Sequence, residues 1–331
     1  MCPPVFSPER MESRPGNIST TSHEVFYLTG FSSLGEHRRL LSIPFFFLLL
    51  YVTSANAIVT FVIATQKKLY EPMYVLIGCM TLLNFFCPLF VLPRMVVSFA
   101  TGRNEVTKGE CLMQLFLTHF SGTFQGSVLV QMGVDRFFAI CWPLRYHSIV
   151  NLRNSILFSV ALAVRNTLTA GVAAGLLIPH TYCHTNAIYH CLCEHTSVVR
   201  LVCGNIARNV VAGVMLFTLT STDCAVVLAI YATIFIVIFH SHTGEARQKA
   251  IHTCGTHLVV ITVGYFCVVC AFVGYRVSNI APDIRILLTI SYLIIPCAFN
   301  PVIYGIRTKE IKVQVAKLLR LSRPKVDSEK S

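Results

Sequence analysis

Long apolar stretches follow one another along most of the chain, separated by short polar segments. A helix needs about 20 consecutive apolar residues to cross a bilayer, and seven stretches reach that length. They lie at about residues 40–65, 72–98, 111–141, 155–178, 205–240, 248–274 and 284–305. The pattern predicts an all-α membrane protein, with a seven-transmembrane helix bundle over residues 40–305, an N-terminal tail over 1–39 and a C-terminal segment over 306–331.

The composition supports this prediction and excludes other classes. Of the 331 residues, 54% are hydrophobic and 13% are charged, against about 25% charged residues in an average soluble domain. The sequence has no Gly-rich phosphate loop, no dinucleotide-binding fingerprint and no HEXXH motif, and the spans leave no room for a soluble catalytic domain. We therefore expect neither an enzyme nor a bound cofactor.

Basic residues are unevenly divided between the two sides of the predicted bundle. With the N-terminus outside, the inner segments hold fifteen Lys and Arg against six acids, and the outer segments hold eleven against eight. This positive-inside bias predicts a multi-pass plasma-membrane protein with an extracellular N-terminus and a cytoplasmic C-terminus. The formal charge of +12 is spread over short loops and the tail, so it does not indicate nucleic-acid binding.

The N-terminal tail has no apolar core of a cleavable signal peptide, so the first span is expected to act as the targeting signal. Asn17 begins the only Asn-X-Ser/Thr sequon in the chain. Since that tail is predicted to be extracellular, glycosylation of Asn17 is expected.

Cysteines gather at the predicted outer surface. Cys183, Cys191, Cys193 and Cys203 lie in the loop over residues 179–204, and Cys111 opens the third span. An oxidising compartment favours disulfides there. The spacing permits one bond from the loop to Cys111 and one closure within the loop, but it does not fix the pairs.

A metal site is the alternative interpretation of this loop, which contains His184, His190, Cys191, Cys193, Glu194 and His195. A disulfide-bonded cysteine has no thiolate to offer a metal, and histidines in an outer loop are usually solvated. We expect no metal site, and we expect Cys191 to be a free thiol.

Four motifs then appear in order along the chain. They are EPMY at residues 71–74, MGVDRFFAICWPLRYHSIV at 132–150, KAIHTCGTHL at 249–258 and PCAFNPVIYGIRTKEIK at 296–312. They resemble the PMY, MAYDRYVAICxPLRY, KAFSTCxSHL and PPxxNPxxYGxRxKExK signatures of odorant receptors, a branch of the rhodopsin-like G-protein-coupled receptors. The resemblance covers the whole transmembrane body.

The resemblance implies a function and two disulfides. A receptor of this family binds a small-molecule odorant from outside and activates a stimulatory heterotrimeric G protein inside, and it is expected in olfactory sensory neurons. By position, the family's disulfides would be Cys111–Cys193 and Cys183–Cys203, which agrees with the spacing.

Asp135 and Arg136 lie at the predicted inner end of the third span. A guanidinium at the membrane edge is costly unless it is paired, so Asp135 can hold Arg136 in a resting state and release it on activation. A snorkelling Arg that only anchors the span is the alternative. In similar receptors, the released Arg turns toward the G protein.

The seventh span carries a second group of switch residues, Asn300, Pro301 and Tyr304. Proline removes a backbone donor and bends a helix, and we expect Asn300 to satisfy polar groups that are freed nearby. After Tyr304, Ile306, Ile311, Val315 and Leu318 fall on one side and basic residues on the other. This pattern predicts a short amphipathic eighth helix on the inner leaflet, with a calmodulin-type target helix as the alternative.

Two substitutions depart from the family. Asn84 and Gln125 stand where odorant receptors usually carry Asp and Glu. Amides of similar shape keep hydrogen bonds but lose charge, so we expect a neutralised sodium pocket.

Two ionisable residues lie deep inside predicted spans, Arg165 in the fourth and Asp223 in the fifth, at similar depths. Intramembrane charges usually face a partner or a cavity. The two are expected to pair; the alternatives are a ligand contact by Asp223, or a hydrated or protonated Asp223.

The ligand site is placed by position in the outer half of the bundle, where polar His119 and Thr123 share one helix face. Neighbouring spans would complete a mostly apolar pocket. The expected lining is His119, Phe120, Thr123, Leu216, Thr220, Tyr265, Val269, Phe272 and Ile290. Core packing is the alternative role for each of them.

Two rival functions remain at this point. A transporter would also be helical and poor in charge, but it should show an internal repeat and discontinuous helices, and the sequence shows no repeat. A non-olfactory receptor of the same architecture, for another small ligand, is the closer rival.

Overall fold

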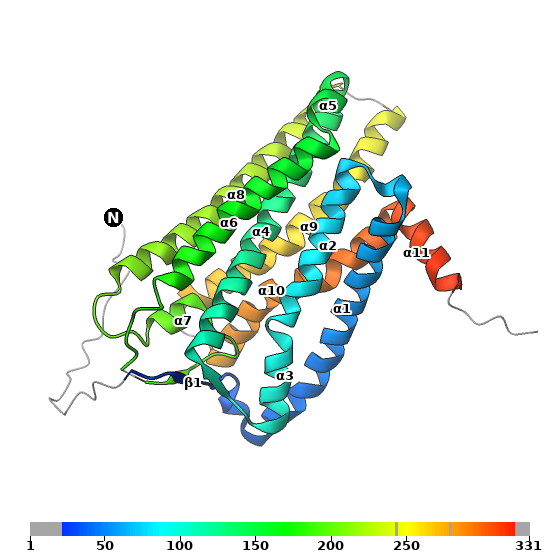
Figure 1. Ribbon diagram of the computed structural model, residues 1–331. Helices are drawn as coiled ribbons and strands as arrows, with labels where there is room; N and C mark the ends of the chain where they lie inside the picture. Colours follow the sequence, from blue (N-terminus) through cyan, green and yellow to red (C-terminus); the bar gives the residue numbers. More distant parts are fainter. Residues whose placement is uncertain (1–21, 184, 242–243, 278–279, 322–331) are drawn as a thin grey trace, which may run out of the picture.

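The computed structural model describes residues 22–183, 185–241, 244–277 and 280–321. Seven helical units run side by side as a bundle (Figure 1). They are α1 (Ser42–Thr65), α2 (Pro72–Leu89) with α3 (Leu92–Thr101), α4 (Lys108–Cys141), α6 (Leu152–Gly175), α8 (Ala207–Ser241), α9 (Gly244–Arg276) and α10 (Pro282–Arg307).

Among the described residues, six units are long and apolar enough to cross a membrane by length and composition; α4 does not meet that criterion. The reason is its position. α4 packs against α2, α6, α8 and α9, so polar side chains along it are covered by protein rather than lipid. Thr118, Ser127, Gln131 and Asp135 are all buried. The predicted third span, α4, is therefore the central helix of the bundle.

The stretch predicted as one span at 72–98 consists of two helices. α2 ends at Leu89, and α3 begins at Leu92 with Pro93 in its first turn. Pro88 and Pro93 each lack a backbone N–H, which leaves carbonyls on this stretch without their usual helical donors. The side chain of Gln114 on α4 donates to the carbonyl of Phe90 at 2.8 Å, so α4 supplies a donor to one carbonyl between the two helices.

A small three-stranded sheet covers the end of the bundle that is predicted to be extracellular, where the sequence predicted only a tail and loops. We call this end the outer end, and the opposite end, which is predicted to be cytoplasmic, the inner end. β1 (Val25–Leu28) pairs with β2 (Glu105–Thr107) in antiparallel and with β3 (Ala187–Ile188) in parallel orientation. Burial alternates along β1, with Phe26 and Leu28 facing inward. A 3-10 segment, η1 (Ser32–Leu41), then leads into α1.

β1 and the short helix α7 (His195–Val199) lie at one end of the bundle, and α5 (Pro143–Ile149) and α11 (Lys309–Leu321) lie at the other (Figure 1). A 3-10 turn, η2 (Lys67–Leu69), joins α1 to α2. α11 buries Ile311 completely, and Val315 and Leu318 pack against the core. Ile306 does not belong to this apolar face: it ends α10 and is 62% exposed, because the chain turns at Thr308 before α11 begins.

Candidate functional site: a binding region at the outer end and a polar switch at the inner end

Two disulfides fix the outer loop. Cys111 at the outer end of α4 is bonded to Cys193 with a Cα–Cα distance of 5.3 Å, and Cys183 is bonded to Cys203 with 5.8 Å. These are the pairs that the family resemblance implies. Cys191 is free and buried, and burial raises the pKa of its thiol to about 12, which keeps it protonated.

The histidines of this loop are not solvated, contrary to the sequence-based expectation. His190 and His195 are both buried, because the bond from Cys193 to α4 pulls their segment into the mouth of the bundle. Burial lowers the pKa of both imidazoles, so the neutral form is favoured. His184 lies outside the described residues. In the part of the chain that the structure describes, no group of three or more His, Cys, Asp or Glu side chains could hold a metal ion.

His119 on α4 and His195 on α7 face one another, with ring centroids 6.2 Å apart and planes 76° to each other. The Nε2 atoms of both rings are buried and have no hydrogen-bond partner within the described residues. His195 also approaches α8 so closely that a Cβ on Gly213 would stand 3.1 Å from its Nδ1 atom. The sequence pointed to His119 but missed His195, since only the folded loop brings His195 inside.

The remaining ligand residues predicted on α4 and α8 face the protein interior. Thr123 is buried, and its hydroxyl donates to the carbonyl of His119 at 2.9 Å. Phe120 stacks on Phe124 with centroids 5.5 Å apart. Leu216 is buried, and Thr220 is half-buried with its hydroxyl donating to the carbonyl of Leu216 at 3.1 Å.

The residues predicted on α9 and α10 divide between the inside and the outside of the bundle. Tyr265 lies on the side of α9 that faces α4, with its hydroxyl near Gly126 of α4. Ile290 is buried in the α1–α2–α10 core. Val269 is wrong as a lining residue: it is 57% exposed. At 100° per residue it falls on the face opposite buried Cys267 and Ala271.

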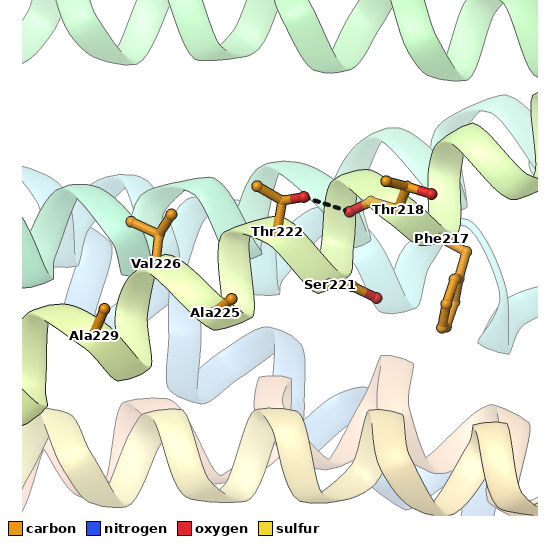
Figure 2. Close-up of a pocket in the computed structure, with 7 residues that line it drawn as sticks. All are labelled: Phe217, Thr218, Ser221, Thr222, Ala225, Val226 and Ala229. Carbon is orange, nitrogen blue, oxygen red and sulfur yellow. Dashed lines mark hydrogen bonds between the residues drawn. The ribbon is translucent and has the colours of Figure 1, made fainter.

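Phe272 lies at the outer seam between α8 and α9, where its ring stacks on Phe217 at 5.0 Å. Next to this pair an open groove runs along the outward face of α8 (Figure 2). The groove is lined by Phe217, Thr218, Ser221, Thr222, Ala225, Val226 and Ala229. It contains none of the nine predicted ligand residues, so it is separate from the site around His119.

Arg165 and Asp223 form an ion pair deep in the bundle. The guanidinium donates to both carboxylate oxygens, at 3.2 and 2.8 Å, and also to the hydroxyl of Ser127 at 2.6 Å. Asn166 donates to the same hydroxyl at 2.9 Å. The pair joins α6 to α8 and rests on α4, so Asp223 is occupied by protein in this structure.

At the inner end, Asp135 and Arg136 pair with each other. The Arg136 guanidinium lies 2.6 Å from the Asp135 carboxylate, which is 2% exposed. Tyr146 of α5 donates to the other carboxylate oxygen at 3.0 Å. Burial, and secondarily Asp135, raises the pKa of the Tyr146 hydroxyl to about 12, so it remains a donor. This contact from Tyr146 was not predicted from the sequence.

In the Asn-Pro-X-X-Tyr segment of α10, the carbonyl that the proline frees pairs with a different residue from the one that the sequence predicted. Pro301 leaves the carbonyl of Cys297 without its helical donor, and Asn56 of α1 donates to that carbonyl at 2.8 Å. Asn300 is not the donor, and its Oδ1 atom is buried with no partner among the described residues. Tyr304 is fully buried with its hydroxyl 3.9 Å from the Met132 sulfur.

The two amides of the predicted sodium pocket, Asn84 and Gln125, have different surroundings. Asn84 is fully buried, and neither its Oδ1 nor its Nδ2 atom has a partner in the described part of the chain. Gln125 contacts the side chain of Cys297. Asn17, the predicted glycosylation site, lies outside the described residues.

Leu144, at the start of α5, is a further surface residue that the sequence did not single out. It is fully exposed beside exposed Trp142, close in sequence to the Asp135–Arg136 pair.

Comparisons with known proteins agree with this architecture. An olfactory receptor family model matches residues 45–321. Olfactory receptor 52K1 of Homo sapiens is 33% identical over 310 residues, which cover 92% of this chain and 98% of the relative. Olfactory receptor 56B34 of Mus musculus is 30% identical over 308 residues, with 92% and 96% covered. The crystal structure of squid rhodopsin superposes with a TM-score of 0.71 at 13% identity, over 86% of this chain and 85% of rhodopsin.

Proposed function

Since the chain belongs to the olfactory receptor family, we propose that it binds a small-molecule odorant in the outer half of its bundle and activates a stimulatory G protein, which signals through cAMP. The chain is a multi-pass membrane protein with the seven-helix fold of G-protein-coupled receptors, a signalling receptor rather than an enzyme. We further propose an extracellular N-terminus and expression in olfactory sensory neurons.

The facing pair of His119 and His195 is the observation that supports the binding site most directly. Two buried imidazole nitrogens without partners among the described residues lie in an otherwise apolar region bounded by Phe120 and Leu216. Leaving a buried polar atom unpaired costs about 1–3 kcal/mol. A small ligand with one polar group and an apolar body would satisfy these nitrogens and fill the region.

The inner end supports the coupling half of the proposal. The Asp135–Arg136 pair, held by Tyr146, is a contact that can open without breaking a covalent bond. Its release would free Arg136 for a G protein docking beside exposed Leu144. Pro301, with Tyr304 packed on Met132, would let α10 adjust during this change.

We propose that sodium ions at the centre of the bundle do not affect the response of this receptor to an agonist. Asn84 and Gln125 supply neutral amides, which offset the dehydration of a hard cation less well than carboxylates do. Replacing sodium with a large organic cation is therefore expected to leave agonist potency unchanged.

The test is a cAMP assay of cells expressing the full chain against a broad panel of small molecules. At least one compound is expected to raise cAMP, and His119→Phe should lower its potency by about tenfold or more, since a hydrogen bond worth about 1.4 kcal/mol is a factor of ten. His37→Phe, an exposed histidine in η1, is the matched control and should behave as wild type. No response to any compound, or equal potency in His119→Phe, would contradict the proposal.

A further inference from the structure

Two free thiols meet in the middle of the bundle. Cys87 of α2 and Cys297 of α10 are both 0% exposed and take no part in a disulfide. The Cys297 sulfur lies 3.0 Å from the carbonyl oxygen of Leu293, and the Cys87 sulfur lies 3.9 Å from the same oxygen. Both thiols therefore lie at the same backbone carbonyl. Two helices that are far apart in sequence thus place two sulfurs together.

Amides accompany the two thiols. The side chain of Gln125 from α4 contacts Cys297, and Asn84 and Asn300 lie three residues from Cys87 and Cys297 on their respective helices. Both asparagines are at least nine-tenths buried. Asn84 Oδ1, Asn84 Nδ2 and Asn300 Oδ1 all lack hydrogen-bond partners in the described ranges. Such orphan polar atoms indicate that this region accommodates a further polar species.

The donor atoms select the kind of species. The region offers two sulfurs and neutral amides, which suit a hard cation such as sodium less well than carboxylates do. Thiols and thiolates prefer soft ions, copper(I) above all. Two sulfurs are sufficient for copper(I) or silver(I), which accept linear two-coordinate ligation, so a third His, Cys, Asp or Glu is unnecessary.

We propose that Cys87 and Cys297 form a binding site for a soft monovalent cation, copper(I), in the centre of this receptor. On binding, one thiol loses its proton to solvent, and the resulting thiolate and the remaining thiol sulfur both coordinate the ion. The copper stays copper(I), and the complex of one cation with one thiolate is neutral. Neutrality matters because an uncompensated charge in the bundle interior is strongly unfavourable.

The surrounding residues fit this complex. Gln125 of α4 lies near Cys297, and its amide N–H can donate to a thiolate there. The carbonyl of Cys297 is already held by Asn56 at 2.8 Å, which fixes the backbone at this ligand. The bound ion joins α2 to α10 between Pro296 and the inner end of α10, so it stabilises the present packing of these helices.

The test uses the purified full-length receptor in lipid nanodiscs, without odorant or G protein, so its outcome is independent of the proposed function. Copper(I) is supplied without oxygen, and silver(I) serves as a redox-inert probe. The bound metal is counted by mass spectrometry after competition with a soluble copper(I) chelator. Wild type should retain one equivalent more than Cys87→Ser or Cys297→Ser, and that equivalent should raise its melting temperature by several degrees.

Cys79→Ser is the matched control, because Cys79 is a free thiol two turns earlier on α2, and it should bind as wild type does. If the serine variants fail to fold, X-ray absorption of the copper-loaded wild type decides, with two-sulfur linear coordination expected. Equal metal content in wild type and folded serine variants, or a copper spectrum without two sulfur ligands, would overturn the proposal.

Discussion

The two ends of the bundle are held together in different ways. At the outer end, three strands from distant parts of the chain form one sheet, and two disulfides join the loop to α4 and to itself. Lys108 lies over the ring of Tyr182, 5.1 Å from its centroid, and reinforces this cap. At the inner end, Asp135 of α4 accepts a hydrogen bond from Tyr146 of α5 and forms an ion pair with its neighbour Arg136.

This difference separates a fixed region from one that can change. Disulfides and sheet pairing hold the outer cap in one arrangement, which keeps His195 facing His119. The inner contacts are individually modest in free energy and can exchange for others. Around Arg136, the hydroxyl of Tyr231 and the Nδ1 atom of His257 are buried and have no partner among the described residues, so new contacts are at hand if the helices shift.

Removing the outer disulfide should have the largest effect. Loss of a native disulfide typically costs about 2–5 kcal/mol, so Cys111→Ala and Cys193→Ala are each expected to abolish surface delivery. The double variant should be no worse than either single one, because both remove the same bond. Surface labelling by flow cytometry measures this.

Cys191→Ala is the control for this prediction, since Cys191 is buried in the same loop but is not bonded. The Cys191→Ala variant should still reach the cell surface at most of the wild-type level. Mass spectrometry that joins Cys193 to Cys183 would refute the pairing.

Arg136→Ala tests the inner end and should remove signalling while leaving folding intact. Arg136 contacts mainly its neighbour Asp135, so the outer binding region should keep its shape. The cAMP response is expected to vanish, with surface expression and odorant binding unchanged. Arg153→Ala, an exposed arginine at the start of α6, should signal as wild type does. A normal cAMP response in Arg136→Ala would refute the role of this residue.

Acidification should have the smallest effect, and it should act on the outer end. Burial lowers the pKa values of His190 and His195 below the ordinary value of about 6.5. Below that pH the unfolded chain binds more protons than the folded protein, so stability falls as the pH falls. Between pH 7.4 and 5.5 the melting temperature of the receptor in nanodiscs should drop by a few degrees.

His195→Asn should reduce this pH-dependent drop, and the exposed His37→Asn should not change it. A receptor that is as stable at pH 5.5 as at pH 7.4 would show that neither buried imidazole resists protonation. Such a result would also weaken the contrast between a closed outer cap and an adaptable inner end.

The sequence alone predicted the long apolar spans and singled out Asp135 and Arg136 as an unusual charged pair. Long apolar stretches favour the lipid interior, and a charged pair such as Asp135 and Arg136 is costly in a span and is usually functional. Both features can therefore be recognised from a short segment of sequence. The depth of Arg165 and Asp223 predicted their pairing for the same reason, and the structure contains that ion pair.

Tertiary structure decided what depends on long-range packing. Only folding pairs β1 with the outer loop and places His195 against His119. Folding also exposes Val269, and it makes Asn56 the hydrogen-bond donor to the carbonyl of Cys297. Each of these outcomes depends on which helix faces which and how each is rotated. Lipid-facing and protein-facing positions are both apolar in a membrane, so the hydrophobic pattern cannot tell them apart.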